Sequence, residues 1–330
     1  MAAACPLVSF VIPVRNDAAR LGDCLASIAA VRPEGASIEV IVADNGSTDD
    51  TAAVAQAAGA RVLSLPGMRV AGVRNEAARA AAGDVLAFVD ADHRLWPGWL
   101  AAALESIALD GVAAVGAPYH APDAGTWVQR MYDTFRQRTT APADTRWLAS
   151  GNLVVRRDAF LAAGAFDASL ETLEDVDLCQ RLRARGGRLL HDPRMRSTHA
   201  GDPATLRALF FGELWRGRDN LRASFRYPLT WHDLPSIVIP LIDLLMLGLA
   251  VTGLLTAGRG GWLITLAALM SVTALAALRA AVMLARLASP SPVEAARALA
   301  VALTYDVARA LAPVWKGSHG GRQRAAGASS

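Results

Sequence analysis

Short apolar runs alternate with helical patterns along the first part of the chain. Runs rich in aliphatic and β-branched residues occupy positions 7–12, 38–42, 61–65 and 85–89, as is typical of buried strands. Helical spacing follows the first run, where Leu21, Leu25 and Ile28 share one face, and helices are also expected at 51–58 and 69–82. Strands that alternate with helices predict an α/β fold, with a mostly parallel sheet flanked by helices.

The pattern continues less regularly as far as residue 191. Strands are expected at 112–117, 148–155 and 188–191, with a short helix at 158–163. A longer helix is expected at 174–185, where Gly186 and Gly187 end it. Residues 123–146 are polar and contain arginines, and they are expected to form a helix and loops.

Acidic residues directly follow two of the predicted strands. Asp44 follows the run at 38–42, and Asp90 and Asp92 follow the run at 85–89. Ligands of open α/β sheets bind beyond the carboxyl ends of the strands, so both acidic turns are expected along one crevice. Carboxylates at alternate positions suit Mg²⁺ or Mn²⁺. An acidic pair at a strand end can equally be a solvated turn, so this spacing alone does not establish a metal site.

The composition changes near residue 234, where long apolar segments begin. Residues 236–257 contain one ionisable residue, Asp243, and are long enough to cross a bilayer as a helix. Residues 262–278 contain none, and they reach a spanning length if the helix continues to Leu287. The short connection at 258–261 predicts a transmembrane helical hairpin. A hairpin buried inside a soluble protein is the alternative.

A third helix is expected at about 293–315, and its charged residues favour an interfacial helix over a third span. Arginines are concentrated at 216–226, before the hairpin, so the positive-inside rule places the preceding domain in the cytoplasm. The expected parts are a cytoplasmic domain at 1–230, a membrane region at 234–315 and a disordered tail at 316–330. The expected location is the cytoplasmic membrane, with more than one span.

Composition fits contact with lipid and argues against several other classes of protein. Hydrophobic residues make up 53% of the 330 residues and the mean hydropathy is +0.29, both high for a fully soluble protein. A net charge of +3 gives no sign of the dense basic stripe that nucleic acid requires. Cys5, Cys24 and Cys179 lie far apart, which argues against a zinc site or disulfides and fits a reducing compartment. The N-terminal segment reads as a strand rather than a signal peptide.

A set of short motifs resembles, in order and spacing, that of family 2 glycosyltransferases. The motifs are Pro13 to Asp17 (PVRND), Val42 to Asp49 (VADNGSTD), Arg74-Asn75, Gly83-Asp84, Asp90-Ala91-Asp92, Ser150-Gly151-Asn152, Arg156-Arg157, Gly164 to Asp167 (GAFD), and Glu174 to Asp177 (EDVD) with Arg181-Leu182. The resemblance covers roughly residues 7–200, and the set is more specific than any single motif. It implies the GT-A nucleotide-diphospho-sugar transferase fold and inverting sugar transfer.

The resemblance implies a donor site at the ends of the first strands. The residues that it implies are Pro13, Asn16, Asp17, Asp44, Arg74 and Asp90. Asp44 resembles the carboxylate that accepts a hydrogen bond from the nucleotide base. Arg74 resembles an arginine near the nucleotide, where a fixed cation can contact phosphate. Asp49 lies in the same turn as Asp44 and could equally cap the next helix.

The resemblance also implies a site for Mg²⁺ or Mn²⁺. Asp92 is expected to bind the metal directly and Asp90 to face both the ribose and the metal. His199 resembles a histidine that completes the metal or diphosphate site, although an isolated histidine is often structural. For His93 and His191 an ordinary structural role is expected.

Asp175 is the candidate catalytic base. Inverting transfer requires a carboxylate that takes the proton of the acceptor hydroxyl. Acidic residues at the start of a helix also stabilise it electrostatically, which is the structural alternative for Glu174 and Asp175. The acceptor-side residues that the resemblance implies are Glu174, Gly151 and Asn152. Asp177 is expected to pair with Arg181 four residues later.

One departure limits the expected reaction. Processive members of the family carry a Gln-x-x-Arg-Trp motif, which the segment 210–220 lacks, so addition of a single sugar is expected. The expected donor is a UDP-, GDP- or dTDP-sugar, and the hairpin favours a lipid-linked or membrane-presented acceptor in cell-envelope glycolipid or polysaccharide synthesis.

Similar patterns of strands, helices and apolar segments occur in two other classes of protein. A nicotinamide-dependent oxidoreductase is rejected, because Pro13-Val14-Arg15-Asn16 stands where a Gly-x-Gly-x-x-Gly turn would be required. A non-catalytic membrane scaffold built on a transferase-like domain is the remaining alternative, although every acidic position expected for catalysis is filled.

Overall fold

The computed structural model describes residues 6–31, 37–136, 139–220, 225–226, 231, 234–256 and 258–315. The chain forms two compact units. The first consists of Met1–Ala124 and Arg136–Asp202, and the second of Gly125–Phe135 and Pro203–Ser330. The second unit therefore includes residues that precede the compositional change at 234.

An eight-stranded sheet forms the centre of the first unit, in the order β3-β2-β1-β4-β8-β6-β9-β7. The strands are β1 (Val8–Val14), β2 (Ile38–Asp44), β3 (Arg61–Ser64), β4 (Val85–Val89), β6 (Val112–Gly116), β7 (Ala143–Asp144), β8 (Asn152–Arg156) and β9 (Arg188–His191). β1 pairs in parallel with β2 and β4, β2 with β3, and β6 with β9. These parallel pairs confirm the predicted α/β sheet.

β8 runs antiparallel between β4 and β6, and it is shorter than the strand predicted at 148–155. Residues 148 and 149 belong to no strand, and Ser150 and Gly151 form a turn instead. Gly151 lies in this turn, where a Cβ atom would come within 2.6 Å of a carboxylate oxygen of Asp90. The apolar pattern could not show this turn, because Asp90 and Gly151 are 61 residues apart in the chain and meet only in the fold.

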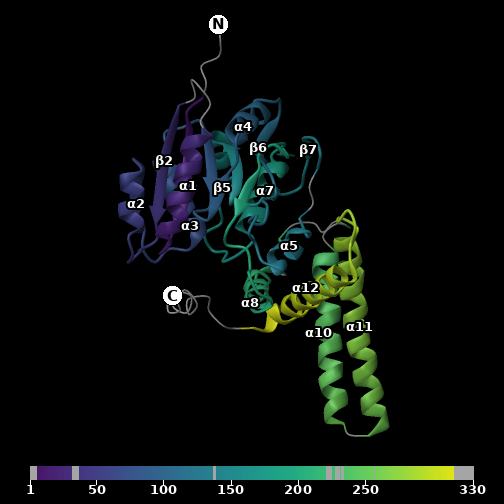
Figure 1. The fold of residues 1–330 in the computed structure, drawn as a ribbon. Coiled ribbons are helices and arrows are strands. Elements are labelled where there is room, and N and C mark those ends of the chain that lie inside the picture. The colour runs from purple at the N-terminus through teal and green to yellow at the C-terminus, as the bar shows by residue number, and fades with distance from the viewer. Residues whose placement is uncertain are drawn as a thin grey trace. The chain divides into compact units, whose positions relative to one another are not determined.

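Helices cover both faces of this sheet (Figure 1). The helices are α1 (Ala18–Ala30), α2 (Thr51–Ala57), α3 (Val70–Ala80), α4 (Trp99–Ile107), α6 (Arg157–Ala162) and α7 (Glu174–Ala184). Residues of α1, α2 and α4 share one core with Phe10 and Ile12, whereas residues of α3, α6 and α7 share the other with Val11. Successive side chains of a strand point to opposite faces, so β1 contributes to both cores.

A separate antiparallel ribbon joins β5 (His93–Leu95) to β10 (Ser197–His199). In its register His93 lies opposite His199, and Leu95 lies opposite Ser197. Strands of three residues carry too little periodicity to be predicted from sequence. This ribbon decides which side chains meet at the functional site.

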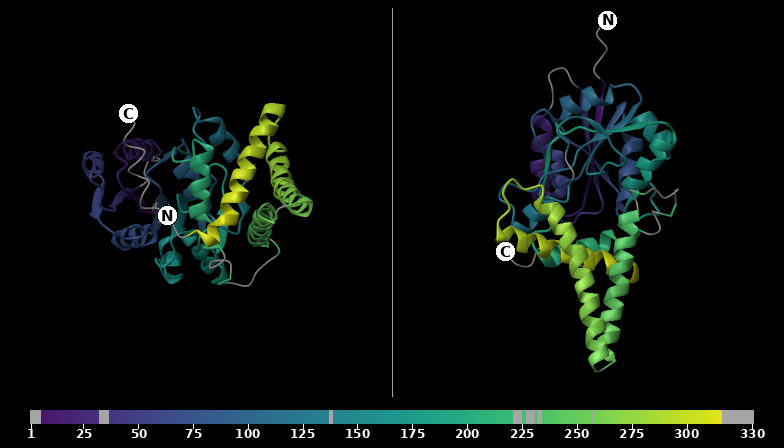
Figure 2. Two further views of the ribbon diagram at one scale, coloured as in Figure 1. Left: turned by 90° about the horizontal axis from the view of Figure 1, so that it is seen from below. Right: turned by 90° about the vertical axis from the view of Figure 1, so that its right-hand side faces the viewer.

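The second unit is helical. Its elements are α5 (Trp127–Asp133), α8 (Leu206–Arg216), α10 (Leu234–Leu255), α11 (Arg259–Leu284), α12 (Pro292–Leu311) and the 3₁₀ turn η1 (Ala312–Val314). α10 and α11 run side by side as a hairpin (Figure 2), close to the segments predicted at 236–257 and 262–287. α12 packs against α8, α10 and α11 and ends before the predicted residue 315. The predicted tail at 316–330 lies outside the described residues.

The hairpin exposes large apolar side chains. Among them are Leu245, Leu255, Trp262, Leu263 and Met270, each at least 59% exposed. Of the residues in the most apolar stretch, 22% are buried in α10 and 28% in α11, so neither helix is the core helix of its unit. Both helices are long and apolar enough to cross a membrane. An exposed apolar surface of this extent requires a non-aqueous surrounding or a partner.

Candidate functional site

The turn after β4 places two carboxylates at the carboxyl end of the sheet. The buried strand ends at Val89, and the amide of His93 donates to the carbonyl of Asp90 over 3.0 Å, which closes the turn. The Asp90 amide donates to the carbonyl of Gly151, so the turn is fixed to the start of β8. Asp90 and Asp92 therefore come from a short, anchored segment.

Asp92, His93 and His199 form a cluster of metal-ligating side chains. One ligand atom from each of them lies within 4.8 Å of those of the other two. His199 Nε2 lies 3.2 Å from a carboxylate oxygen of Asp92, and the rings of His93 and His199 are 4.8 Å apart. Gly201 adjoins this cluster, because a Cβ there would lie 2.0 Å from Asp92 Oδ2. The backbone has to approach this closely for the cluster to form.

A second layer of contacts orients His199. Its Nδ1 lies 2.8 Å from Asp202, and the carboxylate of Asp202 accepts in turn from Arg136 over 2.5 Å. The ring of Tyr119 packs 4.6 Å from that of His199 and 4.0 Å from the guanidinium carbon of Arg136. A carboxylate on one imidazole nitrogen directs the other nitrogen toward a ligand, as is usual for metal-binding histidines.

The histidines of the cluster have opposite pKa shifts. Burial lowers the pKa of His199, but Asp92 and Asp202 outweigh it and raise the pKa to about 10. Burial and the neighbouring His199 lower the pKa of His93 to about 4. Burial alone would raise the pKa of Asp92, yet His199, His93 and Arg20 lower it overall. The two carboxylates thus favour positive charge at this cluster, and one carboxylate with two imidazoles is a donor set that fits a divalent metal ion.

Asp90 forms an ion pair with a buried arginine. Its carboxylate accepts from Arg74 Nη2 over 2.6 Å, and Arg74 Nη1 donates to Glu174 over 2.8 Å. Within the described part of the chain, the cluster of metal-ligating atoms contains His93 in the place where Asp90 was expected. Arg74 is 3% exposed, so the structure gives it the role of positioning two carboxylates. Direct contact between Arg74 and a phosphate would require at least one of its bonds, to Asp90 or to Glu174, to open.

Asp175 stands at the start of α7, beside this ion pair. Its carboxylate accepts from the amide of Val176 over 2.8 Å and from the amide of Ser150 over 3.3 Å. Burial, and then the neighbouring charge of Glu174, raise the pKa of Asp175 from 3.8 to about 7. Leu173 precedes the pair with a φ of 64°, a left-handed conformation that is unfavourable for leucine. A carboxylate with a pKa near neutrality can accept a proton at physiological pH.

Two loops at the ends of β1 and β2 are fastened to each other. The side-chain oxygen of Asn16, a residue with a φ of 51°, accepts from the Thr48 amide over 2.7 Å. The backbone amide of Asn16 donates to the Ser47 hydroxyl over 2.9 Å. Pro13 lies in β1 opposite Ala43 of β2. Asn16 therefore joins the loops, and its side-chain oxygen is already engaged.

The acidic residues of these loops have distinct partners. Asp44 is 6% exposed and accepts from the Ser47 amide over 2.9 Å, whereas Asp17 accepts from Arg20 over 2.8 Å. Arg20 also lies 3.8 Å from Asp92, so it connects the loop after β1 to the metal-like cluster. Asp49 accepts from the amide of Thr51 at 3.1 Å, whereas the N-cap position of α2 is taken by Asp50.

Asn152, an expected acceptor-side residue, has a side chain with three hydrogen-bond partners inside the fold. The side chain accepts from the Trp99 indole over 2.8 Å and donates to two carbonyls, those of Ala117 and Met195. Asn152 is 0% exposed, and its side chain joins α4 to the segments that follow β6 and precede β10. The neighbouring residue Gly151 lies beside the cluster, because a Cβ atom placed on it would be 3.2 Å from His93 Nε2.

Sequence reasoning missed four residues that surround the site, His93, Asp202, Tyr119 and Arg20. His93 directly follows Asp92, yet only its pairing with His199 across the ribbon identifies it as a possible ligand. A signal for Asp202 was present, because an acidic residue three positions after a histidine can reach its ring. Tyr119 and Arg20 had no comparable signal.

Comparison with known proteins agrees with this geometry. Residues 9–162 match the family model for glycosyl transferase family 2. The uncharacterized protein MT1568 of Mycobacterium tuberculosis (strain CDC 1551 / Oshkosh) is 31% identical over 202 residues, which make up 54% of this chain and 63% of that protein. Glycosyltransferase AglE of Haloferax volcanii is 29% identical over 226 residues, 65% of this chain and 71% of that protein. The chain thus spans less than two thirds of the first of these relatives.

A solved structure has the same fold. The mannosyltransferase PcManGT of Pyrobaculum calidifontis, in complex with GDP-Man and Mn²⁺, superposes with a TM-score of 0.62 at 18% identity. The superposition covers 96% of this chain and 89% of that protein. At this identity the likeness shows the fold alone, and it confirms the expected GT-A architecture. Residues 9–162 of this chain thus match glycosyl transferase family 2, and they lie in a unit with the GT-A fold.

Proposed function

We propose that the protein transfers one sugar from a nucleotide-sugar to a lipid-linked or membrane-presented acceptor, with inversion. The proposed location is the cytoplasmic membrane, with the domain at 1–230 in the cytoplasm and a multi-pass region at 234–315. The proposed role is in cell-envelope glycolipid or polysaccharide synthesis.

One observation supports the proposed chemistry most strongly. Arg74 bonds both to Asp90, next to the metal-like cluster, and to Glu174, next to Asp175. The buried guanidinium of Arg74 thereby links the segment that carries the cation site to the segment that carries Asp175, the carboxylate with the raised pKa. Sugar transfer from a diphosphate requires both a group that balances the leaving charge and a base.

In the proposed mechanism, Asp175 accepts the proton of the acceptor hydroxyl while the oxygen of that hydroxyl attacks the anomeric carbon of the donor sugar. The bond from that carbon to the diphosphate breaks, and the nucleoside diphosphate leaves with the electron pair. A divalent cation held by Asp92, His93 and His199 would neutralise charge on the diphosphate. Asp202 and Arg136 hold His199 in position for this role.

For the donor we propose a UDP-, GDP- or dTDP-sugar, with Asp44 at the base. The loops joined by Asn16 lie at the carboxyl ends of β1 and β2, where nucleotides bind in α/β sheets. For the cation we favour Mn²⁺ over Mg²⁺, because two imidazoles are softer ligands than the oxygen set that Mg²⁺ prefers. The similar mannosyltransferase was solved with GDP-Man and Mn²⁺.

The membrane-presented acceptor rests on the hairpin. α10 and α11 have spanning length, with exposed apolar side chains along them. A hairpin in the bilayer would keep the catalytic unit close to lipid-borne substrates. If the full-length protein turns over a water-soluble acceptor as efficiently as a lipid-borne one, this part of the proposal is wrong.

The test is sugar transfer by the full-length protein purified in detergent. A panel of UDP-, GDP- and dTDP-sugars would be supplied with Mn²⁺ or Mg²⁺ and a membrane-lipid extract. We expect metal-dependent transfer from one donor, lost in Asp92→Asn and in Asp175→Asn but kept in Asp177→Asn, whose carboxylate bonds Arg181 instead. Donor binding without turnover of any acceptor would favour the non-catalytic alternative.

A further inference from the structure

The two faces of the β5–β10 ribbon have different chemistry. His93 and His199 point to one face, where their rings meet above Tyr119. Alternation along a strand places Arg94, Trp96, Arg196 and Thr198 on the opposite face. The Trp96 indole donates to Thr198 over 2.8 Å, which confirms that these two side chains share that face.

This opposite face is cationic. The guanidinium carbon of Arg196 lies 3.9 Å from the centre of the Trp96 ring, so the arginine is stacked on the indole. Arg94 and Arg196 are exposed, and in the described parts of the chain neither has a carboxylate partner within ion-pair distance. Stacking leaves the nitrogen edge of a guanidinium available for bidentate contact with an anion.

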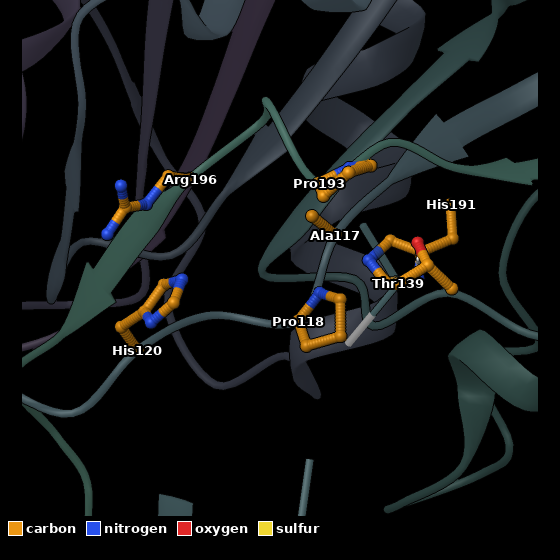
Figure 3. A pocket seen from close by; sticks show the side chains of 7 residues that line it. All are labelled: Ala117, Pro118, His120, Thr139, His191, Pro193 and Arg196. Atoms are coloured by element: carbon orange, nitrogen blue, oxygen red, sulfur yellow. Dashed lines mark hydrogen bonds between the residues drawn. The ribbon is translucent and has the colours of Figure 1, made fainter. Parts of the chain in front are cut away.

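A cavity of about 160 Å³ adjoins this face, and Arg196 is one of its walls. The other residues that line it are Ala117, Pro118, His120, Thr139, His191 and Pro193. Arg196 and His120 lie toward one end and His191 with Thr139 toward the other in the view of Figure 3. The lining so described contains three basic side chains, one hydroxyl and no carboxylate.

The cavity is separated from the metal-like cluster by the ribbon itself. His120 is hydrogen-bonded on both sides to β10, donating to Ser197 and accepting from the His199 amide. Its neighbour Tyr119 packs on the His199 ring instead. One extended segment thus sends Tyr119 to the cluster and His120 to the cavity, which makes the cavity a second site rather than an extension of the first.

We propose that this cavity and the cationic ribbon face bind a phosphoryl group. Arg196 supplies a stacked, pre-oriented fork for two phosphate oxygens. The ring of His120 lines the same space, as do Thr139 and His191, whose hydroxyl and Nδ1 lie 3.3 Å from each other. A volume of about 160 Å³ is below the roughly 300–1,000 Å³ of sites that hold a whole drug-sized ligand, so it suits a phosphate or one headgroup. The group could come from free phosphate or from a phospholipid headgroup, which share this chemistry.

The test is a titration of the full-length, metal-free protein with phosphate. Histidine ring ¹H–¹³C signals would be recorded while inorganic phosphate is added, with His120 assigned through His120→Gln. We expect a saturable shift of the His120 signal that weakens with salt. The double variant Arg94→Gln/Arg196→Gln should raise the apparent Kd at least tenfold. Arg185→Gln, an exposed arginine at the end of α7, should change it less than twofold.

A parallel titration with a short-chain phosphatidic acid below its micelle concentration distinguishes the sources. Tighter binding than phosphate, with the same dependence on Arg196, assigns a lipid headgroup, and equal or weaker binding assigns free phosphate. Absence of a saturable His120 shift with both probes, or equal weakening in Arg185→Gln, overturns the proposal. If the double variant alters the other histidine signals and is therefore misfolded, Arg196→Lys replaces it, with an expected loss of threefold or more.

Discussion

The replacement of Asp175 by asparagine tests the proposed base most directly. The change keeps the shape of the side chain and removes the proton acceptor, while an amide oxygen can still accept from the backbone amides of Val176 and Ser150. A positioned general base typically contributes about 10²–10⁴-fold. We expect kcat to fall by at least about 100-fold with little change in the KM for the donor.

The pKa of Asp175 makes the pH profile informative. With a pKa raised from 3.8 to about 7, the carboxylate loses its charge as pH falls through neutrality. At saturating Mn²⁺, kcat should therefore fall almost tenfold for each pH unit below about 7, whereas an ordinary aspartate would stay ionised from pH 6 to 8. Glu174→Gln removes the neighbouring negative charge and should shift this limb to lower pH.

The same shift predicts an unusual effect on stability. A carboxyl whose folded-state pKa is raised holds its proton more tightly in the folded state, so it destabilises the protein as pH rises from about 4 to above 7. A shift of about three pKa units corresponds to at most roughly 4 kcal/mol, and weaker hydrogen bonds in the variant offset about 1–2 kcal/mol. At pH 8 the Tm of Asp175→Asn should be equal to or higher than that of the native protein.

Asp177→Asn is the matched control, since it removes a carboxylate from the same helix turn. It should cost stability through its lost pair with Arg181 and leave the pH limb of kcat unchanged. The reasoning is refuted if Asp175→Asn keeps more than a tenth of the native kcat, or if its acid limb is the same as that of the native protein.

Three further substitutions test the surroundings of the site. Gly201→Ala would place a methyl group 2.0 Å from Asp92 Oδ2, so we expect loss of Mn²⁺-dependent transfer, measured as the Mn²⁺ concentration for half activation. Asp202→Asn removes the carboxylate that orients His199, and it should weaken Mn²⁺ binding by about 10–100-fold in equilibrium dialysis. Asn152→Leu leaves an indole and two carbonyls without partners at about 1–3 kcal/mol each, so Tm should fall by several degrees.

Controls separate these effects from general loss of folding. Gly22→Ala lies in α1 with its nearest neighbour at an ordinary 3.7 Å, so it should leave Mn²⁺ activation unchanged. Unchanged activation in Gly201→Ala, native Mn²⁺ affinity in Asp202→Asn, or a native Tm in Asn152→Leu would each contradict the role given to that residue.

Local order along the chain was readable from sequence because local interactions produce it. The strands at β1, β2 and β4 and the helices between them follow from hydrophobic periodicity over a few residues. The pairing of Asp177 with Arg181 is confirmed, since residues four apart share a helix face. The two apolar helices were predicted within three residues at each described end, because length and hydropathy alone define them.

The composition of the site depended on contacts between distant segments. His93 lies opposite His199 only through the β5–β10 register, and Arg74 meets Glu174 100 residues along the chain. Asn152 belongs to a motif, yet the fold directs its amide to two carbonyls and an indole. Periodicity and motifs report neighbours within a few positions, whereas strand pairing across the fold decides which distant side chains share a buried space. The sequence by itself thus determined the longer strands and helices and the motifs, and the tertiary structure decided which carboxylates and imidazoles stand together.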